Sequence, residues 1–295
     1  MSVYIPTGEY YIRKILQYVE ETTFATTPTS PTFLPAGVVA DVTTTVTIPE
    51  TVYRQQGSRD PYRDVKFGEA YELQCKYMPV DSTMMKYGVN LAAGTGTVGK
   101  SLSLLMSQDI NSTENYVLIQ GARTNTIDIE ITEGGPIMVT QTFKAKNITT
   151  PSTSHGLTTP TFASTINTAP WSNVNGGSQP FKINSVGYDL SRFKMAVSTG
   201  LDTVQPIGET LTKFIEPTLR TITVDFDMYV QDTVTLADTK SLTARSAVYT
   251  LDTTAPTTIT MTNLQLNKYT SVDSATSANI KSASFSGQCT SVVMT

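Results

Sequence analysis

Histidine is almost absent from this sequence, which has only His155 among its 295 residues. Catalysis by a Ser-His-Asp or Cys-His arrangement, and zinc binding through histidine, therefore have almost no residues available. Cysteine is equally scarce, because Cys75 and Cys289 are too few for a disulfide framework. Both cysteines lie in alternating strand-like runs, so we expect them to be buried as small hydrophobic side chains. These absences argue against an enzyme, and we expect no cofactor and no metal.

Long apolar runs and excess positive charge are missing as well. No segment approaches the roughly 18 consecutive apolar residues of a membrane-spanning helix, and residues 1–24 lack the apolar core of a signal peptide. We therefore expect a cytoplasm-like compartment and no membrane partner. The 21 Lys and Arg residues are outnumbered by 25 Asp and Glu residues. This balance argues against tight binding to a phosphate backbone, but it still allows DNA to pass along the surface.

Alternation of apolar and polar residues is present almost everywhere. Residues 218–230 (TLRTITVDFDMYV) place apolar side chains at every second position, and residues 70–78 (AYELQCKYM) repeat the pattern. A period of two is typical of a strand that is buried on one face. Helical spacing is plausible only in short pieces such as residues 10–21 and 191–197. The pattern predicts an all-β protein with few short helices.

A segment rich in Thr, Ser, Pro, Asn and Gly, residues 149–180, divides the chain almost in half. Its composition is typical of a linker or long loop. We expect Trp171 within it to anchor the segment on a domain or a neighbouring subunit, and His155 to be solvated. The predicted organisation is an N-terminal arm, a first β domain, the linker and a second β domain, at residues 1–37, 38–148, 149–180 and 181–295.

The two halves carry similar features in the same order. A shift of 151 positions matches residues 71–77 with residues 222–228. A shift of 142 positions then matches four further pairs: Val117 with Ile259, Ile119 with Met261, Asn125 with Asn267, and Phe143 with Phe285. Only the lengths of the connections differ. We interpret the halves as a duplication of one β-sandwich or β-barrel domain.

A glycine-rich stretch, residues 94–101 (GTGTVGKS), satisfies the pattern of a nucleotide-binding phosphate loop. Such a loop needs a buried strand before it and a helix after it, and the flanking residues here resemble neither. We expect an exposed hairpin loop that leads into a strand, with Lys100 and Ser101 exposed. A nucleotide-binding enzyme is the alternative.

Charge is concentrated between Arg54 and Lys76, where nine of 23 residues are charged. The five basic and four acidic residues nearly balance, whereas a DNA-binding site would carry one sign. Balanced charge on an extended loop before a long strand favours a contact between subunits, in which Arg side chains meet carboxylates. The alternative is a solvated loop. The expected contact residues are Arg54, Arg59, Asp60, Arg63, Asp64 and Lys66.

Several stretches together resemble the tail tube proteins, also called major tail proteins, of long-tailed viruses of bacteria and archaea. They are YVEETTFATTPTSPTF, GSRDP, SLSLLM and NYVLIQGARTNTIDIEITEGGPIMVTQTFKAKN, at residues 18–33, 57–61, 101–106 and 115–147. The resemblance implies a β-sandwich or barrel with a flanking helix. It also implies that long strands from successive subunits close an inner barrel, and that rings stack into a tube for DNA. Residues 57–62 then belong to a loop that reaches a neighbouring subunit or ring.

On this resemblance the chain assembles with itself and with other tail proteins, in a virion tail built in the host cytoplasm. With two domains per chain, three chains form a trimeric ring of pseudo-sixfold appearance. The lumen is expected to be polar and net negative, with Glu72, Asp225 and Asp227 facing DNA that is not bound sequence-specifically. The alternatives are a capsid decoration protein and the inner tube of a contractile injection machine. The glycine-rich loop and the long linker have no counterpart in a minimal one-domain tail tube protein.

Overall fold

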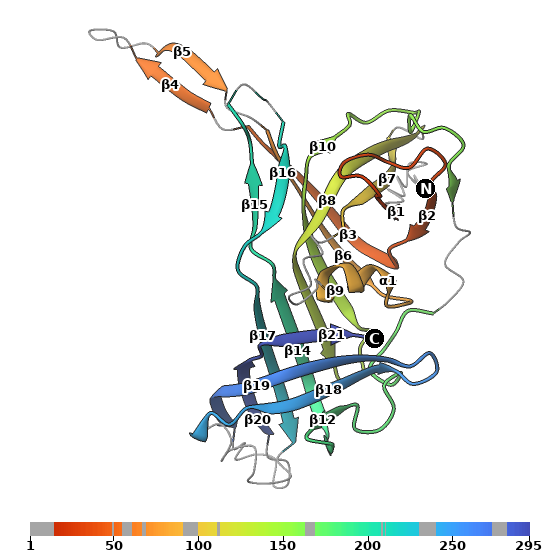
Figure 1. Cartoon of the computed structure of the whole chain (residues 1–295). Helices are drawn as coiled ribbons and strands as arrows, with labels where there is room; N and C mark the ends of the chain where they lie inside the picture. The colour runs from red at the N-terminus through yellow and green to blue at the C-terminus, as the bar shows by residue number, and fades with distance from the viewer. Residues whose placement is uncertain are drawn as a thin grey trace, which may run out of the picture.

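The computed structural model of the chain is built almost entirely of β-strands, so the all-β prediction is confirmed (Figure 1). It describes residues 15–48, 50–54, 61–66, 69–90, 100–110, 113–162, 169–207, 209, 211–229, 240–272 and 282–295. Within these ranges there are 21 strands and one helix, α1 (Thr83–Val89).

Eight strands form one antiparallel sheet, which we call the long sheet. Its order is β3 (Val38–Thr47), β6 (Ala70–Met78), β9 (Met138–Ala145), β8 (Thr113–Thr132), β14 (Leu190–Ser198), β17 (Thr221–Tyr229), β20 (Ser282–Gln288) and β19 (Thr257–Val272). The pairing of β8 with β14 joins the two halves of the chain, with Thr126 opposite Ser198 and Thr132 opposite Arg192. The halves therefore share one sheet.

A second layer of strands covers one face of the long sheet in each half. In the first half it contains β7 (Leu102–Ile110), β10 (Asn147–Ile148), β1 (Ile15–Glu20), β2 (Thr32–Pro35) and β11 (Thr161–Phe162). In the second half it contains β18 (Arg245–Asp252), β21 (Ser291–Met294), β12 (Phe181–Ile183) and β13 (Val186–Tyr188). Most of the buried apolar side chains of both halves form one continuous core between the layers, and Phe33, Leu105 and Leu118 form a smaller separate cluster.

The long strands β8 and β19 each belong to both layers. The first part of β8 pairs with β7 and its last part with β9 and β14, and β19 changes from β18 to β20 in the same way. Both strands contain a residue with positive φ close to this change, Gly121 (φ 68°) and Asn263 (φ 53°). Each lies one position before the last residue of the first part, Ala122 or Leu264. Glycine and asparagine are the residues that adopt this conformation most readily, so the local sequence permits the change of layer.

Two β-hairpins project from the same end of the long sheet (Figure 1). The first consists of β4 (Glu50–Arg54) and β5 (Pro61–Lys66) and connects β3 to β6. The second consists of β15 (Leu201–Val204) and β16 (Phe214–Pro217) and connects β14 to β17. The charged segment, expected as an extended loop, is thus a two-stranded hairpin in its described part.

The order of pairing in the first half recurs in the second. β3, β6, β9 and β8 are adjacent in that order, and so are β14, β17, β20 and β19. The pairing of β8 with β9 is interrupted by a bulge between Thr124 and Thr126, and that of β19 with β20 between Leu266 and Lys268, 142 positions later. The bulges thus enclose Asn125 and Asn267. The predicted domain boundaries remain a prediction, and β1 and β2 of the expected N-terminal arm pair within the first half.

The match of Phe143 with Phe285, made from the sequence, is wrong by two positions. Phe143 lies opposite Thr124, whereas the residue opposite Leu266 at the corresponding place is Gly287 rather than Phe285. A shift of two positions returns the same face of a strand, so alternation alone cannot detect this error.

The two short helical pieces expected at residues 10–21 and 191–197 are wrong where the structure describes them. Residues 15–20 form β1, and residues 191–197 lie within β14. In β14 the buried side chains are Phe193, Met195 and Val197, which follow a period of two. Pairing with β8 on one side and β17 on the other supplies the backbone hydrogen bonds, so tertiary context overrides the weak helical spacing.

Trp171 anchors the central segment on the first half, as predicted. Its side chain is buried. Its backbone N–H donates to the carbonyl of Pro79 at 2.8 Å, and its backbone carbonyl accepts from the N–H of Ile137 at 2.9 Å. The indole therefore belongs to the common core.

Candidate functional site

The face of the long sheet opposite the core is polar and continuous across both halves. It is built by strands whose other side chains are buried, as in β6 and β17. Glu72 is exposed on this face, and Asp225 and Asp227 are half-buried on it. Its acidic side chains include Asp41, Glu72, Asp128, Glu130, Asp225 and Asp227, and its basic ones Lys76, Lys144, Arg192, Lys194 and Lys268. We call it the polar face.

Opposite charges on the polar face lie next to one another on neighbouring strands. Glu72 lies opposite Lys144, and Lys194 lies between Glu130 on β8 and Asp225 on β17. Arg192 forms ion pairs with Glu130 at 3.3 Å and with Asp227 at 3.8 Å. Cross-strand neighbours of opposite sign are mildly stabilising, and they leave little uncompensated charge.

Asp128 differs from the other carboxylates of the polar face. The residues opposite it, Thr140 and Ala196, carry no charge. Partial burial raises the pKa of its carboxyl, although the charge of Lys194 opposes the shift. The centre of the polar face therefore contains a carboxylate without a cation directly across either neighbouring strand.

The expected subunit-contact residues lie on the first hairpin as far as the structure describes them. Arg54 ends β4, while Arg63, Asp64 and Lys66 belong to β5 and are brought together by its pairing with β4. Arg59 and Asp60 lie outside the described residues. The contact itself remains a prediction.

The second hairpin is a candidate contact surface that the sequence reasoning missed. Its large apolar side chains Val204, Ile207 and Phe214 are exposed, and so is Leu219 just after it. Apolar side chains gathered on a projecting element are typical of protein–protein contact sites. The 151-position shift could have found this hairpin, because it matches Leu201 with Glu50, the first residue of β4.

The base of the second hairpin is held by residues of the first half. Lys144 donates through Nζ to the carbonyl of Leu201 at 2.6 Å, and Arg123 donates to the carbonyl of Ile215. The Leu201 N–H donates to Oδ1 of Asn125 at 3.1 Å. Leu201 and Ile215 are both buried, so the junction between the halves is well packed at this end.

The glycine-rich loop does not have the surroundings of a phosphate loop in its described part. Lys100 is engaged in an ion pair with Glu20, and β7 rather than a helix follows Ser101. The expected exposure of Ser101 is wrong, because its side chain is buried. Its backbone carbonyl accepts from the N–H of Glu21, which holds this part of the chain beside β1. Residues 91–99 lie outside the described residues.

Lys100→Ala is expected to change the free energy of unfolding by less than about 1 kcal/mol, because an exposed ion pair contributes little. The variant and the original chain should both show no saturable ATP or GTP binding in calorimetric titrations. A micromolar nucleotide affinity that the substitution abolishes would overturn this interpretation of the loop.

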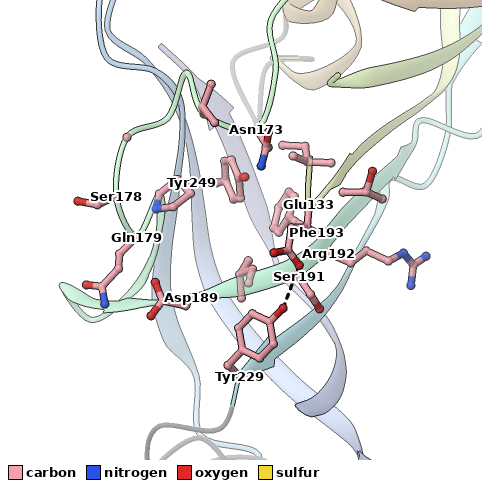
Figure 2. Close-up of a pocket in the computed structure, with 16 residues that line it drawn as sticks. Glu133, Asn173, Ser178, Gln179, Asp189, Ser191, Arg192, Phe193, Tyr229 and Tyr249 are labelled. Atoms are coloured by element: carbon pink, nitrogen blue, oxygen red, sulfur yellow. Dashed lines mark hydrogen bonds between the residues drawn. The ribbon is translucent and has the colours of Figure 1, made fainter. Parts of the chain in front are cut away.

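A cavity of about 490 Å³ lies where β8 and β17 end and β14 begins, at the end of the long sheet opposite the hairpins. Figure 2 shows the residues that line it. Its lining includes Glu133, Arg192 and Tyr229. The Tyr229 hydroxyl donates to Oε2 of Glu133 at 2.9 Å, and this hydrogen bond raises the pKa of the tyrosine. The lining has neither histidine nor cysteine, and the described residues contain no cluster of three or more His, Cys, Asp or Glu that could hold a metal ion. The cavity offers hydrogen bonds rather than a nucleophile paired with a base.

The cysteines are buried and free, as predicted. Burial raises the pKa of Cys75 to about 12 and that of Cys289 to about 11. Thiols with such pKa values carry almost no thiolate at neutral pH, so they are unreactive in the folded chain.

His155 is only partly exposed, so the expectation of a solvated histidine is wrong. Its ring lies 5.5 Å from the ring of Tyr116 and 6.0 Å from that of Phe162, and Nδ1 accepts from the Leu157 N–H. These aromatic contacts cover a side chain that the polar local sequence suggested would be open to water.

Comparison with known proteins gives one family. The family model described as phage tail tube protein matches residues 12–289. No curated protein is a significant match to the chain. Within the described residues, no helix has the length and apolar character needed to cross a membrane.

Proposed function

The chain belongs to the phage tail tube protein family, and on this premise we propose that it assembles into stacked rings through which viral DNA is delivered. Family membership makes it a structural protein of the virion tail, a class that associates with itself and with other tail proteins. The observation that carries the proposal is the long sheet, which has one buried face, one polar face and two strands, β3 and β19, at its edges. We also propose that assembly takes place in the host cytoplasm.

The proposed ring contains three chains. The repeated pairing order supports two homologous β domains per chain, at residues 38–148 and 181–295, connected by residues 149–180. Three chains then supply six domains around the axis, a number that gives the ring a pseudo-sixfold appearance. Closure into a ring also covers sheet edges that would otherwise pair without control.

The polar face is the proposed lining of the lumen, with the exposed Glu72 and the half-buried Asp225 and Asp227 on the side of the passing DNA. Hydroxyl side chains such as Thr142 and Ser286 lie between its charged residues. The cations Lys144, Lys194 and Arg192 lie beside carboxylates, which compete with phosphate for them. A surface of this kind binds DNA weakly, so the molecule can slide.

Electron microscopy of the purified protein tests the proposal. Stacked rings with three chains and six similar β domains each are expected. Six whole chains per ring would contradict the trimer while leaving the tube in place. A protein that stays monomeric at high concentration, or that forms shells, would contradict the tube itself.

Arg59→Glu combined with Arg63→Glu is expected to leave the monomer folded and to abolish long polymers. The proposed contact would then place like charges opposite each other, which costs several kcal/mol when the groups are desolvated. Sedimentation measures the polymers, and circular dichroism verifies the fold. Lys240→Glu with Lys182→Glu is a control of equal charge change at exposed lysines outside both hairpins. Unchanged polymer length in the Arg59 and Arg63 variant would refute the contact.

A further inference from the structure

We infer that β3 of one chain pairs antiparallel with β19 of the next chain, with Val46 opposite Tyr269 of the adjacent copy. This inference rests on the proposed ring, and it specifies which strands join successive chains and in which register. The occupant of each free sheet edge is thus a second copy of this chain.

The template for this seam is the junction between the halves of a single chain. There β8 pairs with β14 so that Ile127 lies opposite Val197 and Asp128 opposite Ala196. Ile127 and Val197 are 0% and 1% exposed, so the junction is fully packed on the core side. A ring of alternating first and second halves needs an equivalent junction from each second half to the next first half.

The pairing registers identify the equivalent residues. Phe193 of β14 lies opposite Phe226 of β17, and Val42 of β3 lies opposite Cys75 of β6. The pair in the second half therefore lies 151 positions after the pair in the first half on both strands. The bulges in β8 and β19 differ by 142 positions. Val197 therefore corresponds to Val46, and Ile127 corresponds to Tyr269. By the same shifts Thr45 should lie opposite Thr270, and Thr47 opposite Lys268.

The exposure of Val46 and Tyr269 is what we expect for strands whose pairing partner lies in another chain. Val46 is 52% exposed although it lies on the same face of β3 as the buried Val42. Tyr269 is only partly covered, by the ring of Phe285 at a centroid distance of 5.1 Å. Among the described residues, β3 pairs only with β6, and residues 265–272 of β19 pair only with β20. Both edges are thus open where the template requires a strand.

The asparagines in the two bulges add a second feature to the seam. Within the chain, the carbonyl and Oδ1 of Asn125 accept from the N–H groups of Thr199 and Leu201, at 2.9 and 3.1 Å. The corresponding asparagine, Asn267, is exposed. The shifts place the backbone of Ile48 and Glu50 of the next chain where it would meet Asn267. The seam would therefore carry the first hairpin, with Arg63 and Asp64, against the second half of the adjacent copy.

Disulfide trapping tests the register. Thr45→Cys with Thr270→Cys, and separately Val46→Cys with Tyr269→Cys, should give dimers and closed trimers on non-reducing gels after mild oxidation of assembled protein. Thr45→Cys with Lys268→Cys is the matched control, since its residues are two positions out of register and too far apart for a relaxed disulfide. We expect at least a fivefold lower yield from the control. The native thiols are buried and do not interfere.

The outcomes separate the seam from the proposed function. Rings seen by microscopy together with no trapping of either in-register pair would overturn the seam and leave the tube standing. Equal trapping of the control pair would overturn the register. Trapping of these cysteines to a different tail protein in virions would show another occupant. An original chain that forms no rings at all would instead defeat the proposed function.

A substitution provides a test that needs no disulfide. Val46→Lys introduces charge at the seam, whereas Val293→Lys places it at a comparably exposed valine on β21. We expect Val46→Lys to reduce the assembled fraction at least tenfold without a change in monomer melting, and Val293→Lys to assemble normally. Normal assembly of Val46→Lys would overturn the seam.

Discussion

Phe226→Ala is expected to lower the free energy of unfolding by about 3–5 kcal/mol, the usual effect of removing a buried phenylalanine ring. Phe226 lies on β17 between β14 and β20 and is 1% exposed. Its ring centroid lies 4.8 Å from that of Phe181 and 5.2 Å from that of Phe285. Truncation would leave a cavity that these two rings can fill only in part, so the lost contacts are not recovered.

Urea unfolding of the monomeric protein, followed by circular dichroism, measures the effect. Phe214→Ala is the matched control, because it removes the same atoms from an exposed ring on the second hairpin. We expect this variant to lower the free energy of unfolding by less than about 1 kcal/mol, as most surface substitutions do. Equal losses for the two variants would show that Phe226 is not part of a packed core.

Glu21→Ala is expected to lower the free energy of unfolding by about 3 kcal/mol or more, because it removes a buried charged acceptor and leaves its hydrogen-bond donors without a partner. Glu21 is 5% exposed. Its Oε1 accepts from the Gly121 N–H at 2.9 Å and from Oγ of Ser103 at 2.6 Å, and its Oε2 accepts from the Ala25 N–H at 2.8 Å. Because Gly121 is the positive-φ residue of β8, the carboxylate supports the strand where it changes layer.

Thermal unfolding and urea titration measure this loss. Glu21→Gln keeps one acceptor oxygen and should lose clearly less than Glu21→Ala. Glu133→Ala removes an exposed carboxylate that accepts from Tyr229, and it should cost less than about 1 kcal/mol. A loss for Glu21→Ala as small as that for Glu133→Ala would contradict the role assigned to the buried carboxylate.

Much of the local structure was predictable because burial on one face leaves a direct mark in the sequence. The alternation in residues 70–78 and 221–229 identifies β6 and β17, together with the side chains that face the core. The same reasoning failed for residues 191–197, where spacing compatible with a short helix is also compatible with a strand. It failed for Ser101 and His155, because Glu21 contacts the first and Tyr116 the second from segments distant in the sequence.

The candidate surfaces were predictable only in part. The charged residues of the first hairpin stand out by composition, whereas the apolar residues of the second hairpin resemble any strand until their exposure is known. Nor did the sequence indicate that Lys194 would lie between Glu130 and Asp225. These residues lie on three strands, and only the pairing register brings them together.

The amino-acid sequence by itself determined the all-β class, the faces of the main strands, the burial of both cysteines and the membership of a family. Each of these depends on composition, on a period of two within one strand, or on the order of features along the chain. The tertiary structure alone decided which strands are neighbours, that β8 and β14 unite the two halves, and that β3 and β19 are left at the edges. The physical reason is that strand partners are distant in sequence and that a register shift of two residues leaves every side chain on the same face.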